Sequence, residues 1–115
     1  MASTVGRDIV ERISSEVTSG NAALGVILDS TASQTADSVL DWIMDFINKT
    51  IRLEGKRLTK HRYSPGYGDL PLQNQSIIYE AVSMDKLGVT LTPTYIMDPE
   101  KSVLAIAGIE RIESQ

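Results

Sequence analysis

The chain has 115 residues, a length typical of one domain with a single modest hydrophobic core. Hydrophobic residues (42%) and charged residues (23%) occur in the proportions of a folded soluble protein. The formal net charge is −4 and the basic residues form no long run, which argues against binding to nucleic-acid phosphates. The chain has no cysteine, which excludes disulfides, thiolate zinc sites and cysteine nucleophiles and fits a reducing compartment.

The sequence has no pattern typical of export or membrane insertion. Arg7 and Asp8 place charges where a signal peptide would be apolar. The longest apolar run, residues 22–28, is interrupted by Gly25 and is too short to span a bilayer. We therefore expect a cytoplasmic protein that acts without a membrane partner.

The N-terminal part of the chain has apolar residues at helical spacing. They recur every fourth position from Val5 to Val17, which predicts an amphipathic helix with Thr4 as its N-cap and an end at Gly20. A second helix is predicted to end at Gly55. Its apolar positions are Ala36, Val39, Leu40, Ile43, Ile47 and Ile51. Residues 24–28 fit either a buried strand or the first turns of this helix, and their alanine content favours helix.

Polar residues within the second predicted helix allow two interpretations. Asp29, Ser30, Thr31 and Ser33 indicate a kink or a hydrogen-bonded contact between helices; alternatively, Asp29 faces a ligand or a partner. Asp37, Asp41 and Asp45 follow at four-residue spacing and are predicted to form a solvated face that repels itself slightly. Trp42 lies one position off the apolar stripe and is predicted to pack at its boundary.

The C-terminal half alternates short strands with loops. A strand is predicted at residues 58–63, a short helix after Pro71 and a strand at 89–92, followed by a turn at 98–101. The apolar run 103–109 predicts a continuous strand covered on both faces. We therefore predict one α+β domain over residues 1–115, with N-terminal helices packed on a small, mostly antiparallel sheet that has one inserted helix.

The segment Arg62 to Pro71, RYSPGYGDLP, contains two prolines and two glycines that restrict or permit special backbone geometry. Arg62 at the strand end can bind a carboxylate through two parallel N–H bonds, a geometry that lysine lacks. Tyr67 can cover a flat ring or donate its hydroxyl. The alternative is a tight connection between strand and helix with a surface arginine.

The order of these features resembles the adenosylmethionine loop in the activation domain of vitamin B12-dependent methionine synthase. The matching features are an arginine, then Pro65-Gly66-Tyr67, then a proline and a helix. The segments 87–92 and 101–106 agree with the family in order and spacing, and the close resemblance covers residues 57–109. The sequence YSPGYGDLPL is especially similar to the short stand-alone versions found beside corrinoid-dependent methyltransferases.

The resemblance implies an S-adenosylmethionine-binding accessory protein that supports reductive methylation of a corrinoid enzyme such as methionine synthase. Arg62 would hold the ligand's carboxylate, and backbone groups of Ser64, Pro65, Gly66 and Tyr67 would contact its nucleoside. Cobalamin would reside on a partner methyltransferase, so the chain would belong to that system and would not be an enzyme alone.

A complete activation domain is about twice as long, so the resemblance implies a partial domain. The earlier part of the family's domain supplies an acidic residue for the ligand's amino group, and the sequence assigns no residue to that role. A partial domain also leaves apolar sheet surface, which predicts a homodimer or a partner complex. The alternative function is an interaction or regulatory module that retains the fold and does not bind adenosylmethionine.

Overall fold

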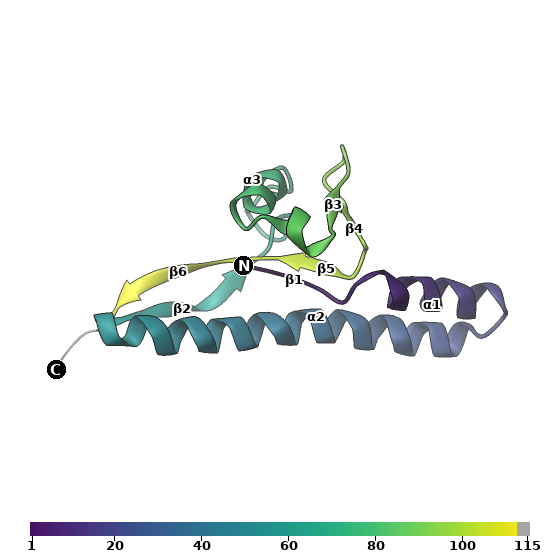
Figure 1. The fold of residues 1–115 in the computed structure, drawn as a ribbon, viewed down its shortest axis with the longest axis horizontal. Helices are drawn as coiled ribbons and strands as arrows, with labels where there is room; N and C mark the ends of the chain where they lie inside the picture. The colour runs from purple at the N-terminus through teal and green to yellow at the C-terminus, as the bar shows by residue number, and fades with distance from the viewer. Residues whose placement is uncertain (113–115) are drawn as a thin grey trace.

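A computed structural model describes residues 1–112, which form an elongated molecule of 60 × 28 × 27 Å (Figure 1). Its longest element is the 30-residue helix α2 (Ala22–Ile51), so residues 24–28 are helical as favoured. A short 3-10 turn, η1 (Arg52–Glu54), extends α2, and Gly55 ends it with φ of 72°. The predicted stop at Gly55 is therefore confirmed. Among residues 1–112, α2 included, no helix has the length and apolar character needed to cross a membrane.

Helix α1 (Arg7–Thr18) packs antiparallel on the first half of α2 (Figure 1). A Cβ at Gly25 would lie 2.6 Å from Cγ2 of Val17, so the glycine permits this close approach. The predicted start at Thr4 is wrong. Residues Ala2–Thr4 form strand β1, and the Thr4 hydroxyl accepts the Gly6 N–H at 3.1 Å. Pairing with a distant strand therefore overrides the local capping signal.

The strands form three antiparallel pairs: β1 with β5 (Ser102–Leu104), β2 (Lys56–Tyr63) with β6 (Ile106–Arg111), and β3 (Thr90–Leu91) with β4 (Met97–Asp98). Helix α3 (Asn74–Ala81) and the short helix η2 (Met84–Leu87) lie between β2 and β3 in the chain. The α+β class is thus as predicted, with one α-helix inserted between β2 and β3, although β1 precedes the two N-terminal helices. The sheet consists of separate two-stranded pieces.

The hydrophobic core cluster consists of Met84 of η2, Val89 and Leu104 of β5, with Ile78 and Tyr79 of α3 packed against it. Leu40 of α2 is also fully buried. The hydroxyl of Ser3 donates to the Ala36 carbonyl at 2.7 Å and ties β1 to α2.

The predicted continuous strand at 103–109, covered on both faces, is wrong. At the buried Ala105 the run changes its partner strand from β1 to β2. Beyond this residue β6 is open, with Ile106 and Ile109 exposed to 42% and 62%. The physical reason is that β2 packs on α2, whereas β6 lies on the side of β2 that faces away from α2 (Figure 1). An apolar run shows only that a strand is hydrophobic, and the number of covering layers comes from the topology.

The polar residues inside α2 make a bonded contact, although not with another helix. The Lys101 ammonium, in the turn between β4 and β5, lies 2.7 Å from an Asp29 carboxylate oxygen. The same ammonium donates to the Ser33 hydroxyl at 3.0 Å. These contacts fasten the β4–β5 turn to the middle of α2.

Candidate functional site

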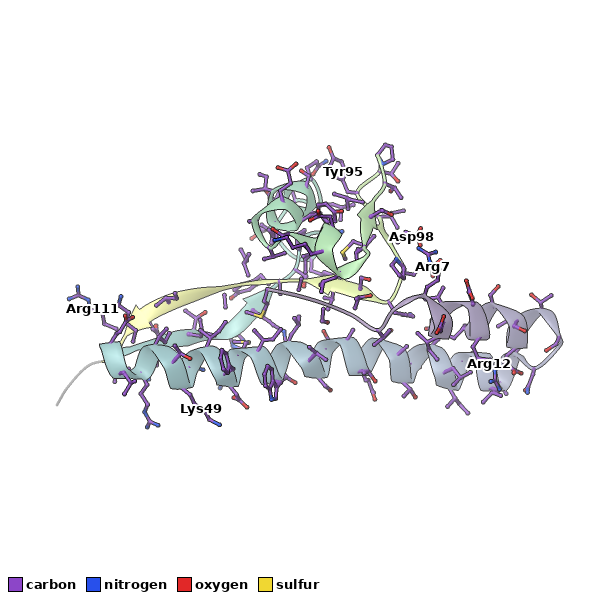
Figure 2. The ribbon with its side chains drawn as sticks, in the orientation of Figure 1. Arg7, Arg12, Lys49, Tyr95, Asp98 and Arg111 are labelled. Atoms are coloured by element: carbon purple, nitrogen blue, oxygen red, sulfur yellow. The ribbon has the colours of Figure 1, made fainter. Side chains whose placement is uncertain are left out.

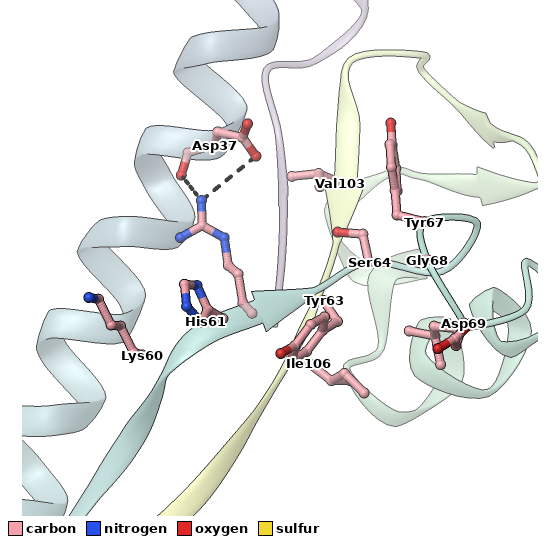
Figure 3. A pocket seen from close by; sticks show the side chains of 12 residues that line it. Asp37, Lys60, His61, Tyr63, Ser64, Tyr67, Gly68, Asp69, Val103 and Ile106 are labelled. Carbon is pink, nitrogen blue, oxygen red and sulfur yellow. Dashed lines mark hydrogen bonds and ion pairs between the residues drawn. The ribbon is translucent and has the colours of Figure 1, made fainter.

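The candidate site forms because β2 runs back along α2 after Gly55. Arg62, the last residue but one of β2, points towards α2 and donates through Nη1 to an Asp41 carboxylate oxygen at 2.5 Å. Its Nη2 donates to the Asp37 carbonyl at 3.2 Å and lies 3.8 Å from the Asp37 carboxylate, the two contacts dashed in Figure 3. The Arg62 side chain is 22% exposed, so its charge is largely covered while both carboxylates remain open to solvent.

An open cavity of about 1020 Å³ lies beside this arginine. Its walls come from α2, the end of β2, the loop that follows β2, and the β5–β6 segment (Figure 3). The lining residues are Asp37, Lys60, His61, Arg62, Tyr63, Ser64, Tyr67, Gly68, Asp69, Leu70, Val103 and Ile106. Roughly 300–1,000 Å³ is typical of small-molecule sites, so the cavity has room for a nucleoside with an amino-acid tail.

The loop after β2 is held by its own backbone. Gly66 has φ of 92°, and a Cβ there would lie 3.2 Å from Cδ1 of Leu72. The Gly66 N–H donates to the Leu70 carbonyl at 2.9 Å, and the Tyr67 N–H donates to the Ser64 carbonyl at 3.3 Å. These two amides are therefore used within the loop. The loop residues that line the cavity are Ser64, Tyr67, Gly68, Asp69 and Leu70.

The predicted site residues divide into two groups. Arg62, Ser64 and Tyr67 line the large cavity together. Pro65 is buried and lines a smaller cavity of about 300 Å³ between the loop and β4, to which Ser64 and Tyr67 also contribute. Gly66 lines neither cavity and fixes the shape of the turn.

Sequence reasoning missed Asp37 and Asp41, which it assigned to a solvated, mutually repelling face. Both are about two-thirds exposed, but each contacts Arg62, and Asp37 also lines the cavity. The signal in the sequence was the spacing of Asp41 and Arg62 on either side of Gly55, which brings them together only if the strand returns along the helix. The third member of the series, Asp45, makes no ion pair with any residue from 1 to 112.

The electrostatics of the cavity come from opposite charges placed side by side. Lys60 and Arg62 bring positive charge to one wall, and Asp37 and Asp69 bring negative charge. Such a pair can recognise a zwitterion, because a guanidinium binds a carboxylate while a carboxylate binds an ammonium. The described residues contain no cluster of three or more potential metal ligands. Away from the cavity, burial lowers the pKa of the Met1 ammonium, which donates to the Ala105 carbonyl at 2.8 Å.

No protein-family model matches this chain, and no curated protein matches it. The assignment of a function therefore depends on the residues of the cavity and on the resemblance in the loop.

Proposed function

We propose that the cavity beside Arg62 binds S-adenosylmethionine, and that the chain is an accessory protein for a corrinoid-dependent methyltransferase. The observation that carries the proposal is the position of Arg62. This arginine occupies the position before the Pro-Gly-Tyr loop at which the family has its carboxylate-binding arginine, and it lines the cavity of about 1020 Å³. Adenosylmethionine would supply a methyl group to a cobalamin held by the partner protein.

The residues present fit the amino-acid end of this ligand. The Arg62 Nε has no hydrogen-bond acceptor among residues 1–112, so one edge of the guanidinium remains for a carboxylate. Asp37 lies within 3.8 Å of the same guanidinium and is 66% exposed, which suits a partner for the ligand's ammonium. In this proposal Asp37 takes the role for which the sequence assigned no residue.

The loop supplies the groups for the nucleoside. The Tyr67 side chain is 76% exposed, so its ring is free to cover a flat base. The Ser64 hydroxyl lines the cavity next to it and can donate to or accept from a ribose oxygen. Because the amides of Gly66 and Tyr67 are used within the loop, these side chains would make the polar contacts that the resemblance assigned to backbone groups.

A second candidate function is an interaction module that does not bind adenosylmethionine. The contacts of Arg62 with Asp41 and Asp37 favour it, because the guanidinium already has anionic partners within the chain. In that reading the arginine holds β2 on α2 and the cavity is only a surface hollow.

Calorimetric titration with adenosylmethionine separates the two functions. The accessory protein should bind it with one site per chain, with S-adenosylhomocysteine as a competitor for the same site. Absence of binding at millimolar ligand, with the protein folded by circular dichroism, would overturn the proposal and favour the interaction module.

A further inference from the structure

The outer face of α2 and of the η1 turn that extends it carries an apolar stripe that the rest of residues 1–112 leaves exposed. Val39, Trp42, Phe46 and Leu53 are exposed to 40%, 67%, 57% and 93%. With Lys49 they follow the 3-4-3-4 spacing of a coiled-coil seam. The stripe is distinct from the buried positions of α2, which are Gly25, Ala32, Ala36 and Leu40.

The two aromatic rings of the stripe are already ordered against each other. The ring centroids of Trp42 and Phe46 are 5.7 Å apart with an interplanar angle of 11°, a stacked pair. The sequence predicted Trp42 as boundary packing, and the structure instead leaves two-thirds of it exposed. Stacking limits the conformational freedom that the rings would lose on docking, which favours association through this face.

The charges along α2 identify the partner that fits this stripe. Of the aspartates on α2, Asp29 is paired with Lys101, and Asp37 and Asp41 are paired with Arg62. The charges of α2 and η1 that remain on either side of Asn48 are Asp45 before it and Lys49 and Arg52 after it. Asp45, Lys49 and Arg52 form no ion pair among residues 1–112. Figure 2 shows Lys49 pointing away from the side of α2 on which the strands lie.

A second copy of α2 running in the opposite direction satisfies both the apolar and the charge pattern. Asp45 and Arg52 are one heptad apart on the same flank of the stripe, so an antiparallel pairing centred near Asn48 sets Asp45 of each copy beside Arg52 of the other. The same register lays Trp42 against Leu53 of the second copy.

We propose that this stripe is the interface of an antiparallel homodimer formed by α2 of two copies. The contact is self-complementary, as a two-fold symmetric interface requires. It lies on a different face from the ligand cavity, because Asp37 and Asp41 point towards β2. The dimer is therefore independent of adenosylmethionine binding.

Sedimentation equilibrium of the full chain, from micromolar to sub-millimolar concentration, tests the interface. The native chain should dimerise, and Trp42→Glu should be monomeric over the same range. Ile77→Glu is the matched control, since Ile77 on α3 is also 67% exposed and lies outside the stripe, and it should dimerise as the native chain does. Circular dichroism checks that each variant is folded.

A charge exchange tests the antiparallel register. Asp45→Arg and Arg52→Asp should each weaken dimerisation by about tenfold or more, because like charges then face each other across the interface. The double variant should recover dimerisation to within a few-fold of the native value. A native chain that stays monomeric overturns the proposal and leaves the stripe to a different protein. A double variant weaker than both single variants also overturns it, as does a dimer insensitive to Trp42→Glu.

Discussion

Arg62 and Asp41 are 21 positions apart in the chain and joined by a direct hydrogen bond between strand β2 and helix α2. The bond orients the guanidinium at the wall of the cavity and holds β2 on α2. It also places a carboxylate where a ligand's carboxylate would compete for the same charge. Replacing Asp41 therefore tests whether the Arg62 guanidinium binds the carboxylate of a ligand.

Replacing Asp41 with asparagine should raise the affinity for S-adenosylhomocysteine. The Asp41 side chain is 69% exposed, and an exposed ion pair contributes about 0.2–1 kcal/mol, so the expected gain is about 1.4- to 5-fold. Methylthioadenosine, which lacks the amino-acid end, should bind as before. Asp45→Asn is the control, because Asp45 lies one turn further along α2 without contacting Arg62. An equal gain for both ligands would contradict the competition.

Valine at position 66 should impair ligand binding more than it lowers the melting temperature. The φ of 92° at Gly66 is unfavourable for a branched residue, and Leu72 leaves little space for a Cβ. The loop should shift, and with it Ser64 and Tyr67. Gly68→Ala is the control, because φ of 58° costs about 1–2 kcal/mol but no atom lies within 4 Å of the new Cβ. Normal binding by Gly66→Val would show that the loop is only a connector.

Removing the charge of Lys101 should destabilise the fold. The Lys101→Met variant keeps most of the side chain, which is only 17% exposed, and loses the contacts of the ammonium to Asp29 and Ser33. Hydrogen bonds to charged groups contribute about 1.5–3 kcal/mol, and urea denaturation should show a loss towards the lower end because Asp29 is half exposed. If Asp29 instead served a ligand or a partner, the free energy of unfolding would be unchanged.

Truncating Leu40 should test the position of the core. Leu40 is fully buried, so Leu40→Ala should lower the free energy of unfolding by about 2–5 kcal/mol. Ile27→Ala removes apolar atoms from a side chain on the same helix that is 61% exposed, and it should change stability by less than about 0.5 kcal/mol. Similar losses for the two variants would mean that the packing of α2 differs from the one described.

The sequence predicted the elements whose signals are local. Helical spacing with Gly20 and Gly55 as stops located both long helices, and the glycine-rich loop located Gly66 in a conformation that excludes a side chain. The predictions that were wrong concern residues whose structure depends on contacts between segments far apart in the sequence. Thr4 lies in a strand because residues 102–104 pair with β1, and β6 is open because α2 packs on its partner strand β2.

Chain geometry fixes the distances that allow Arg62 to contact the aspartates of α2, but not the direction of the strand that carries it. Arg62 lies seven residues beyond Gly55, about 23 Å at the rise of a strand, while Asp41 lies 14 residues before it, about 21 Å at the rise of a helix. A tight reversal at Gly55 therefore brings the two side by side. What the sequence lacked was the direction of β2, because a strand returning along the helix and one leaving it have the same pattern.

The most direct measurement of the central claim is a cycle that combines Arg62→Ala with S-adenosylhomocysteine and methylthioadenosine in calorimetric titrations. A charge-assisted contact of about 1.5–3 kcal/mol predicts that the native chain prefers S-adenosylhomocysteine by about 10- to 150-fold. Arg62→Ala should remove most of that preference. The preference that remains should come from the ligand's amino group, and Asp37→Asn should remove it. If Arg62→Ala weakened the binding of both ligands equally, the claim would be contradicted, because Arg62 would then only shape the loop. A native chain that binds neither ligand at millimolar concentration would also contradict it.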